Sequence, residues 1–97
     1  MLDLTPDQLS LVKGVLGRLV PGVPVWAFGS RVDGTAAETS DLDLAVMADA
    51  PLSLERIGLL RDAFSSSNLP FRVDIVDWAA IGDEFRAVVR RVYEVVQ

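Results

Sequence analysis

The sequence predicts a small α/β (α+β) fold in which helices flank a mixed β-sheet, in the order α-β-β-α-β-α. Three observations predict it. Apolar residues recur with helical spacing in three segments, and three short runs between them have the period or composition of strands. A helical segment separates the second strand from the third, as in a crossover between parallel strands. A loop of about ten residues separates the first two strands, and such a loop permits antiparallel pairing.

The first helix is predicted to begin after Thr5. Thr5 as the N-cap, Pro6 at the first helical position and Gln8 three residues after the cap form a capping-box signature. Apolar residues then recur at helical spacing, and Pro21-Gly22 ends the pattern. One helix is therefore expected between Thr5 and this turn.

Three strands are predicted, at residues 23–28, 41–47 and 71–76. The first is dense in β-branched and aromatic residues and stops at Gly29-Ser30. The second and third alternate apolar residues with other residues, and this period of two gives each strand one buried face. The sheet is thus expected to pack against helices on that face.

Two further helices are predicted. One covers residues 54–64 and ends in the polar run 65–68. The other is predicted to continue to the C-terminus on the apolar residues Ile81, Phe85, Val88, Val92 and Val95. Its polar side carries Arg86, Arg90 and Arg91, which form either a docking surface or an ordinary solvated helix face.

Length and composition limit the class of protein. A chain of 97 residues has room for one core, so residues 1–97 are expected to form one domain. The formal net charge is −5, with 14 acidic and 9 basic residues, which argues against direct nucleic-acid binding. No apolar run approaches the ~20 residues that span a bilayer. We therefore expect a soluble, cytoplasmic protein that does not bind membranes. Both a monomer and a homo-oligomer are compatible with the sequence.

The chain contains neither cysteine nor histidine. Disulfides, thiolate zinc sites and cysteine nucleophiles are therefore excluded, as are Ser-His-Asp triads and histidine metal centres. Any catalysis has to use carboxylates, hydroxyls, backbone amides, arginines and a bound cation.

Gly29-Ser30 follows the first predicted strand directly. A glycine at this place lets another group approach the backbone, and successive amides with a hydroxyl can form a phosphate-binding concavity. The same pair of residues is also common in ordinary turns.

Three aspartates are predicted on one face of the sheet. Asp41 and Asp43 are two residues apart on a strand, so their carboxylates point the same way about 6.6 Å apart. Two such carboxylates repel each other unless a cation lies between them, and Mg²⁺ prefers oxygen ligands of this kind. Asp74 joins them if its strand pairs beside the second one. The alternatives are a solvated strand face and an Asp74 that is ion-paired with an arginine such as Arg72.

Taken together, these residues resemble a known pattern. Gly29-Ser30, ten intervening residues, Asp41-Leu42-Asp43 and the later Asp74 are similar to the G-S-x10-D-x-D plus third carboxylate of nucleotidyltransferases related to DNA polymerase β. The chain looks like the minimal nucleotidyltransferase (MNT) branch, over nearly its whole length. It departs from that branch at Val32-Asp33, where members often carry a second basic or small residue.

The resemblance implies roles for six residues. Asp41 and Asp43 would hold Mg²⁺ ions that bridge the triphosphate of ATP, and Asp74 would complete a second metal site and help to deprotonate the acceptor hydroxyl. The nucleotide-binding residues would be Gly29, Ser30 and Arg31. Attack at the α-phosphorus would then expel pyrophosphate without a covalent enzyme intermediate.

The resemblance also implies a partner. MNT proteins of this kind resemble the antitoxins of HEPN/MNT toxin–antitoxin pairs, which bind a HEPN ribonuclease toxin and, in the active branch, transfer AMP to one of its tyrosines. The first alternative is a non-catalytic antitoxin that inhibits its toxin by binding and occlusion. The second is an adenylyltransferase that modifies a small molecule.

Overall fold

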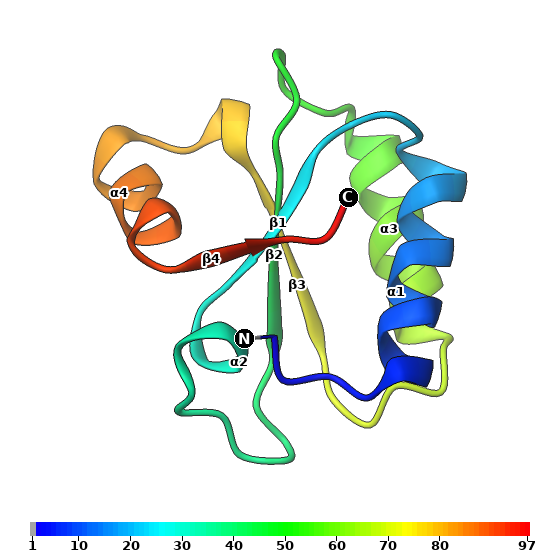
Figure 1. Ribbon diagram of the computed structural model, residues 1–97. Helices are drawn as coiled ribbons and strands as arrows, with labels where there is room; N and C mark the ends of the chain where they lie inside the picture. The colour runs from blue at the N-terminus through cyan, green and yellow to red at the C-terminus, as the bar shows by residue number, and fades with distance from the viewer. Residues whose placement is uncertain (1) are drawn as a thin grey trace.

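A four-stranded mixed sheet forms the centre of the molecule, and helices cover both of its faces (Figure 1). The structure is a computed structural model, and it describes residues 2–97. The elements follow in the order α1 (Pro6–Leu19), β1 (Val25–Phe28), α2 (Ser30–Asp33), β2 (Leu42–Val46), α3 (Leu54–Ser65), β3 (Val73–Asp77), a 3₁₀ turn (Trp78–Ala80), α4 (Asp83–Arg91) and β4 (Tyr93–Val95). The predicted α/β class is confirmed.

The strand order in the sheet is β3-β2-β1-β4. β1 pairs antiparallel with both β2 and β4, and β2 pairs parallel with β3. Both predicted pairings are therefore confirmed: the antiparallel one across the polar loop, and the parallel one across α3. Because β1 runs against β2 and β3, the end of β1 and the beginnings of β2 and β3 lie at the same edge of the sheet.

The main core lies between the sheet and the helices α1 and α3, which stand together on one face (Figure 1). Leu16 of α1, Leu44 of β2 and Leu60 of α3 are fully buried there. Full burial of a leucine side chain stabilises the fold by about 1.5–3 kcal/mol. A smaller cluster under α4 on the opposite face contains Phe28 and Val89.

The N-terminus of α1 has the predicted capping box. The Thr5 side chain accepts a hydrogen bond from the backbone N–H of Gln8 at 3.1 Å, and the Gln8 side chain accepts one from the backbone N–H of Thr5 at 3.0 Å. Two donors that the helix itself cannot satisfy are thereby paired.

Two predicted boundaries differ from the structure near the first strand. The strand was expected from residue 23, but β1 begins at Val25, because Pro24 has no N–H to donate to a neighbouring strand. The loop after it contains the short helix α2, whose Val32 and Asp33 N–H groups both donate to the Gly29 carbonyl at 3.0 Å. The predicted polar loop therefore begins with one helical turn.

The prediction of a helix that continues to the C-terminus is wrong. α4 ends at Arg91, and the chain then runs as strand β4 along the edge of β1. The Val96 N–H donates to the Val25 carbonyl at 2.8 Å, and Val96 is buried. The β-branched and aromatic residues of this segment favour a strand, and the free edge of β1 supplies backbone partners that a helix would not use.

Residues 2–97 contain no helix that is both long enough and apolar enough to cross a membrane.

Candidate active site

Three of the predicted site residues meet at one edge of the sheet. Asp43 on β2 is the register partner of Phe28 on β1 and of Asp74 on β3. Asp43 and Asp74 therefore lie side by side on neighbouring strands, which are about 4.8 Å apart. Gly29 follows Phe28 directly, so the end of β1 lies beside Asp43 as well. The parallel register of β2 and β3 brings together residues that are 31 positions apart in the sequence.

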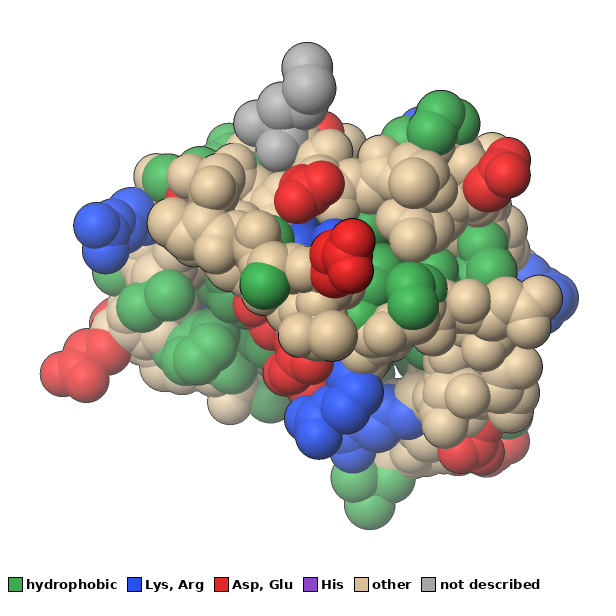
Figure 2. Space-filling view, turned by 90° about the horizontal axis from the view of Figure 1, so that it is seen from below, with side chains coloured by type: hydrophobic (Ala, Val, Ile, Leu, Met, Phe, Trp, Pro, Cys, Tyr) green, Lys and Arg blue, Asp and Glu red, His purple; other side chains and the backbone are tan. Residues whose placement is uncertain are grey.

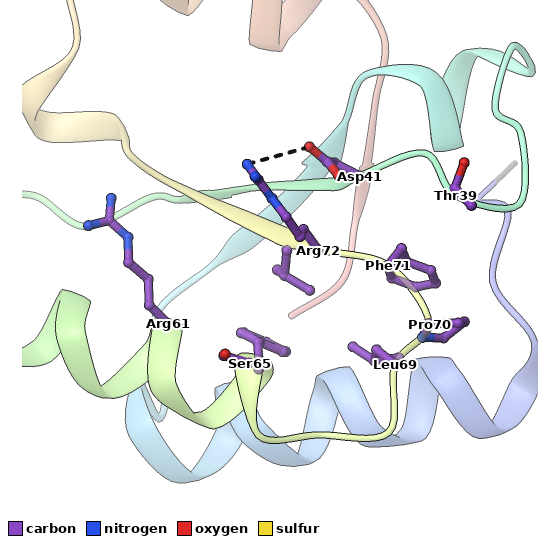
Figure 3. Close-up of a pocket in the computed structure, with 10 residues that line it drawn as sticks. Thr39, Asp41, Arg61, Ser65, Leu69, Pro70, Phe71 and Arg72 are labelled. Carbon is purple, nitrogen blue, oxygen red and sulfur yellow. Dashed lines mark ion pairs between the residues drawn. The ribbon is translucent and has the colours of Figure 1, made fainter.

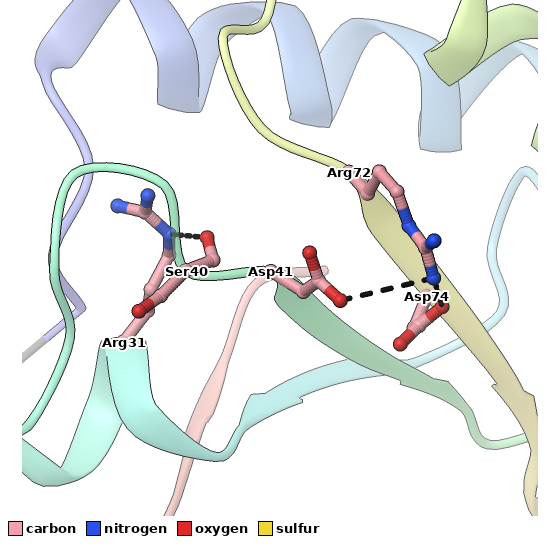
Figure 4. Close-up of polar contacts among 5 residues, drawn as sticks. All are labelled: Arg31, Ser40, Asp41, Arg72 and Asp74. Carbon is pink, nitrogen blue, oxygen red and sulfur yellow. Dashed lines mark hydrogen bonds and ion pairs between the residues drawn. The ribbon is translucent and has the colours of Figure 1, made fainter.

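Asp41 joins this group through an arginine. The Nη2 atom of Arg72 lies 3.9 Å from the Oδ2 atom of Asp41 and 3.7 Å from the Oδ1 atom of Asp74 (Figure 4). The Arg72 side chain is 80% exposed, so this arrangement is held weakly. Seen from the edge where β2 and β3 begin, acidic side chains gather near the middle of the face with basic side chains directly beside them (Figure 2).

The Asp43 carboxyl group is the electrostatically unusual member of the set. Its partial burial raises its pKa from the ordinary 3.8 to about 6, and the negative charges of Asp74 and Asp41 act in the same direction. A carboxylate that is partly desolvated and faces two like charges is stabilised by a cation. The face is thus arranged to attract positive charge to Asp43.

This raised pKa predicts a pH dependence of stability without metal. The folded state holds the Asp43 proton more tightly than the unfolded state, so this carboxyl stabilises the fold below about pH 4, and the contribution is lost as the pH rises through about 6. We expect the Asp43→Asn variant to lack this loss. The measurement is urea unfolding of both proteins in EDTA between pH 4.5 and 7.5, and parallel pH curves would contradict the prediction.

Gly29 has a conformation that brings the loop against Asp43. Its φ of +80° lies in the region that favours glycine, and a Cβ atom there would collide with the Oδ2 atom of Asp43 and lie 3.3 Å from its Cγ atom. Only glycine permits this close approach. Ser30, the first residue of α2, follows at once, so the predicted Gly29-Ser30 pair does lie beside the carboxylates.

Arg31 is not an exposed cation beside the carboxylates. Its side chain is buried, and its Nε, Nη1 and Nη2 atoms donate to the carbonyls of Ser40, Asp3 and Glu38 at 2.9, 2.9 and 2.8 Å. The guanidinium also lies 3.9 Å from the centre of the Phe71 ring. The structure therefore gives Arg31 a different task from the predicted phosphate contact: it links the loop before β2, through Ser40 (Figure 4), to Asp3 of the N-terminal segment.

The chemistry of the carboxylates fits a divalent cation. Within residues 2–97 no three acidic side chains already converge as ligands of one ion. Mg²⁺ does not require such a cage, since it usually takes one or two protein carboxylates and completes its shell with water and substrate phosphates. One Arg72 nitrogen already lies within 4 Å of two of the three carboxylates, so a single cation can serve more than one of them.

A hollow of about 630 Å³ adjoins the site at Asp41 and Arg72 (Figure 3). Leu69, Pro70 and Phe71 give it an apolar wall, and Arg61 of α3 reaches toward it from the other side. The hollow has room for a side chain of a second molecule next to the carboxylates.

Two neighbours of the site were not predicted from the sequence. One is the set of three carbonyls that hold Arg31, which no sequence pattern marks because backbone acceptors occur at every residue. The other is the end of α4, where Arg91 and Val92 line a hollow together with Gly29. The one sequence feature that indicates this placement is the strand propensity of residues 92–96, and the helical spacing of the apolar residues points against it.

Comparison with known proteins identifies the family. Residues 23–96 match the family described as "Polymerase beta, Nucleotidyltransferase". The chain is 49% identical to a Haemophilus influenzae protein named "Probable protein adenylyltransferase MntA", over 99% of this chain and 84% of that protein.

Two solved structures share the fold. One is described as a toxin–antitoxin with AMP-PNP, with a TM-score of 0.78 and 24% identity, and the other as a mutant of the toxin–antitoxin MntA-HpeT, with a TM-score of 0.77 and 22% identity. Each comparison covers 92% of this chain and 72% of the other. The family match spans most of the sequence and includes every residue of the site, so the chain belongs to the polymerase beta nucleotidyltransferase family and is a nucleotidyltransferase.

Proposed function

We propose that this nucleotidyltransferase is an antitoxin that transfers AMP from ATP to a hydroxyl group of its partner toxin and thereby neutralises it. The observation that carries the proposal is the convergence of Gly29, Asp43 and Asp74 at one sheet edge, with Asp41 beside them. Two features of the relatives support it: one is named a protein adenylyltransferase, and one fold neighbour is a toxin–antitoxin with an ATP analogue.

Asp41, Asp43 and Asp74 are the residues that would hold Mg²⁺. When bound, the cation supplies positive charge that offsets the negative charge of the triphosphate and of the leaving pyrophosphate. The raised pKa of Asp43 favours this role, since a bound cation removes the repulsion that Asp43 meets from its two neighbours.

Gly29 and Ser30 are the residues that would bind the outer phosphates, through backbone amides and a hydroxyl. Asp74, half exposed at the rim, would accept the proton of the acceptor hydroxyl. The acceptor oxygen then forms a bond to the α-phosphorus, and the bond from that phosphorus to the bridging oxygen of the β-phosphate breaks. AMP is thereby attached to the acceptor and pyrophosphate leaves.

A tyrosine of a HEPN ribonuclease is the acceptor that we propose. The apolar wall of the hollow beside Asp41 suits an aromatic ring whose hydroxyl reaches the carboxylates. The side chains of Asp41 and Asp74 are about half exposed, so the site is open to solvent. A protein acceptor that brings its own surface suits an open site of this kind.

The test uses ATP labelled on the α-phosphate, the purified chain, the co-expressed partner and Mg²⁺. Label is expected on the partner, on a tyrosine identified by mass spectrometry, and the partner's ribonuclease activity is expected to fall at an antitoxin-to-toxin ratio well below one. Neutralisation that requires equimolar antitoxin and no ATP would instead indicate occlusion and contradict the proposal.

A further inference from the structure

The end of α4 lies beside Gly29 because of how the chain is threaded. Tyr93 of β4 is the register partner of Phe28 of β1, and the two strands are antiparallel. The residue after Phe28 is therefore adjacent to the residue before Tyr93, which places Val92 and the preceding Arg91 next to Gly29. The register brings the end of β1 and the start of β4 together, and Gly29, Arg91 and Val92 line one hollow there.

A hollow of about 180 Å³ lies at this junction. The residues that line it are Gly29, Asp33, Val88, Arg91 and Val92. Of these five residues, Arg91 carries the one positive charge. Arg91 therefore lines the same hollow as Gly29, the first residue of the Gly29-Ser30 turn.

Other arginines have different partners. The Nη2 atom of Arg72 lies 3.9 Å from Asp41 and 3.7 Å from Asp74. Arg31 is held by three backbone carbonyls. Arg86 donates to the Trp78 carbonyl at 2.9 and 3.2 Å, and the guanidinium groups of Arg86 and Arg90 lie 4.8 and 4.9 Å from the centre of the Trp78 ring. Among the arginines, Arg91 is the one that lines a hollow with Gly29.

Asp33 lines the same hollow as Arg91. Both the hydroxyl and the backbone N–H of Thr35 donate to the Asp33 carboxylate, and these bonds lower its pKa, with a smaller lowering from the charge of Arg91. The carboxylate is thus ionised at neutral pH and attracts the guanidinium. Of the α2 residues, only the acidic Asp33 lines the hollow, since Arg31 is held by the three carbonyls.

From this placement we propose that Arg91 binds a phosphate group of the nucleotide at the Gly29-Ser30 turn. The ligand chemistry is that of a polyphosphate, whose oxygens accept two parallel hydrogen bonds from a guanidinium. α4 and β4 thus take part in nucleotide binding, although the motif residues lie on other elements. The inference rests on the proposed use of ATP.

The test is isothermal titration of AMP-PNP, in Mg²⁺ and without partner, into the unaltered chain and into Arg91→Gln, Arg91→Lys and Arg90→Gln. A charged hydrogen bond to phosphate contributes enough that its loss weakens binding by about ten-fold or more. We expect that loss for Arg91→Gln, a smaller one for Arg91→Lys, and less than about a two-fold change for Arg90→Gln, the matched control on the same helix. Adenosine, which lacks phosphate, should bind all four proteins alike.

Three outcomes would overturn the assignment of Arg91 without overturning the proposed function. The first is AMP-PNP binding by Arg91→Gln that equals that of the unaltered chain, and the second is an equal loss in Arg90→Gln. The third is a loss of AMP transfer without a loss of AMP-PNP affinity, because Arg91 would then act on the acceptor. If the unaltered chain itself failed to bind AMP-PNP, the assignment and the proposed function would both be wrong. Thermal melting of each variant shows whether it is folded.

Discussion

Asp43→Asn is expected to reduce the rate of AMP transfer by about a thousand-fold or more, because it removes a charge aimed at the reacting centre. The same change should raise the melting temperature measured in EDTA at neutral pH. The amide that replaces the carboxylate carries no charge, so the cost of burying a carboxylate and the repulsion from Asp74 and Asp41 both disappear. Rates of label transfer to the partner and thermal melts of the purified variant test the two effects.

The matched control is Asp49→Asn, which makes the same chemical change beyond the other end of β2. Its transfer rate should equal that of the unaltered chain. Mg²⁺ should raise the melting temperature of the unaltered chain and of this control, but not that of Asp43→Asn. An Asp43→Asn protein that still neutralises its partner at substoichiometric amounts would refute catalysis by these carboxylates.

Arg31→Met is expected to lower the free energy of unfolding by about 2–4 kcal/mol, because three carbonyl groups lose their donor and a well-packed cation is removed from Phe71. Arg31→Lys should recover less than about half of this loss, since one ammonium cannot reach three carbonyls in the directions of a guanidinium fork. Urea unfolding followed by circular dichroism measures both changes. Arg18→Met, at an exposed position at the end of α1, should stay within about 0.5 kcal/mol.

This pair of variants also separates the two roles considered for Arg31. If the side chain were a phosphate ligand, Arg31→Met would keep its stability and lose AMP-PNP affinity. The structure predicts the opposite result. Arg31→Met should lower the free energy of unfolding, and AMP-PNP affinity should change only to the extent that the loop around Ser40 becomes more mobile.

Much of the fold could be predicted because local patterns report local hydrogen bonding. The capping box at Thr5 and Gln8 can be predicted because its two hydrogen-bonding residues are only three positions apart. The alternation in β2 records which face of that strand is buried, and the structure places Leu42, Leu44 and Val46 in the main core as expected. The prediction fails for residues 92–97, because their apolar spacing suits a helix whereas the unpaired edge of β1 binds them as a strand.

The sequence by itself determined which residue types could do chemistry and where a turn had to contain glycine. Only the tertiary structure decided which of them meet. Asp43 lies beside Asp74 because of a strand register. Arg31 is bound by the carbonyls of Asp3 and Glu38, which belong to two other segments. Arg91 lines a hollow with Gly29 because β4 pairs with the edge of β1. These contacts join residues that are far apart in the chain. Their geometry is set by the pairing of strand edges and of buried carbonyl groups, which local sequence patterns do not record.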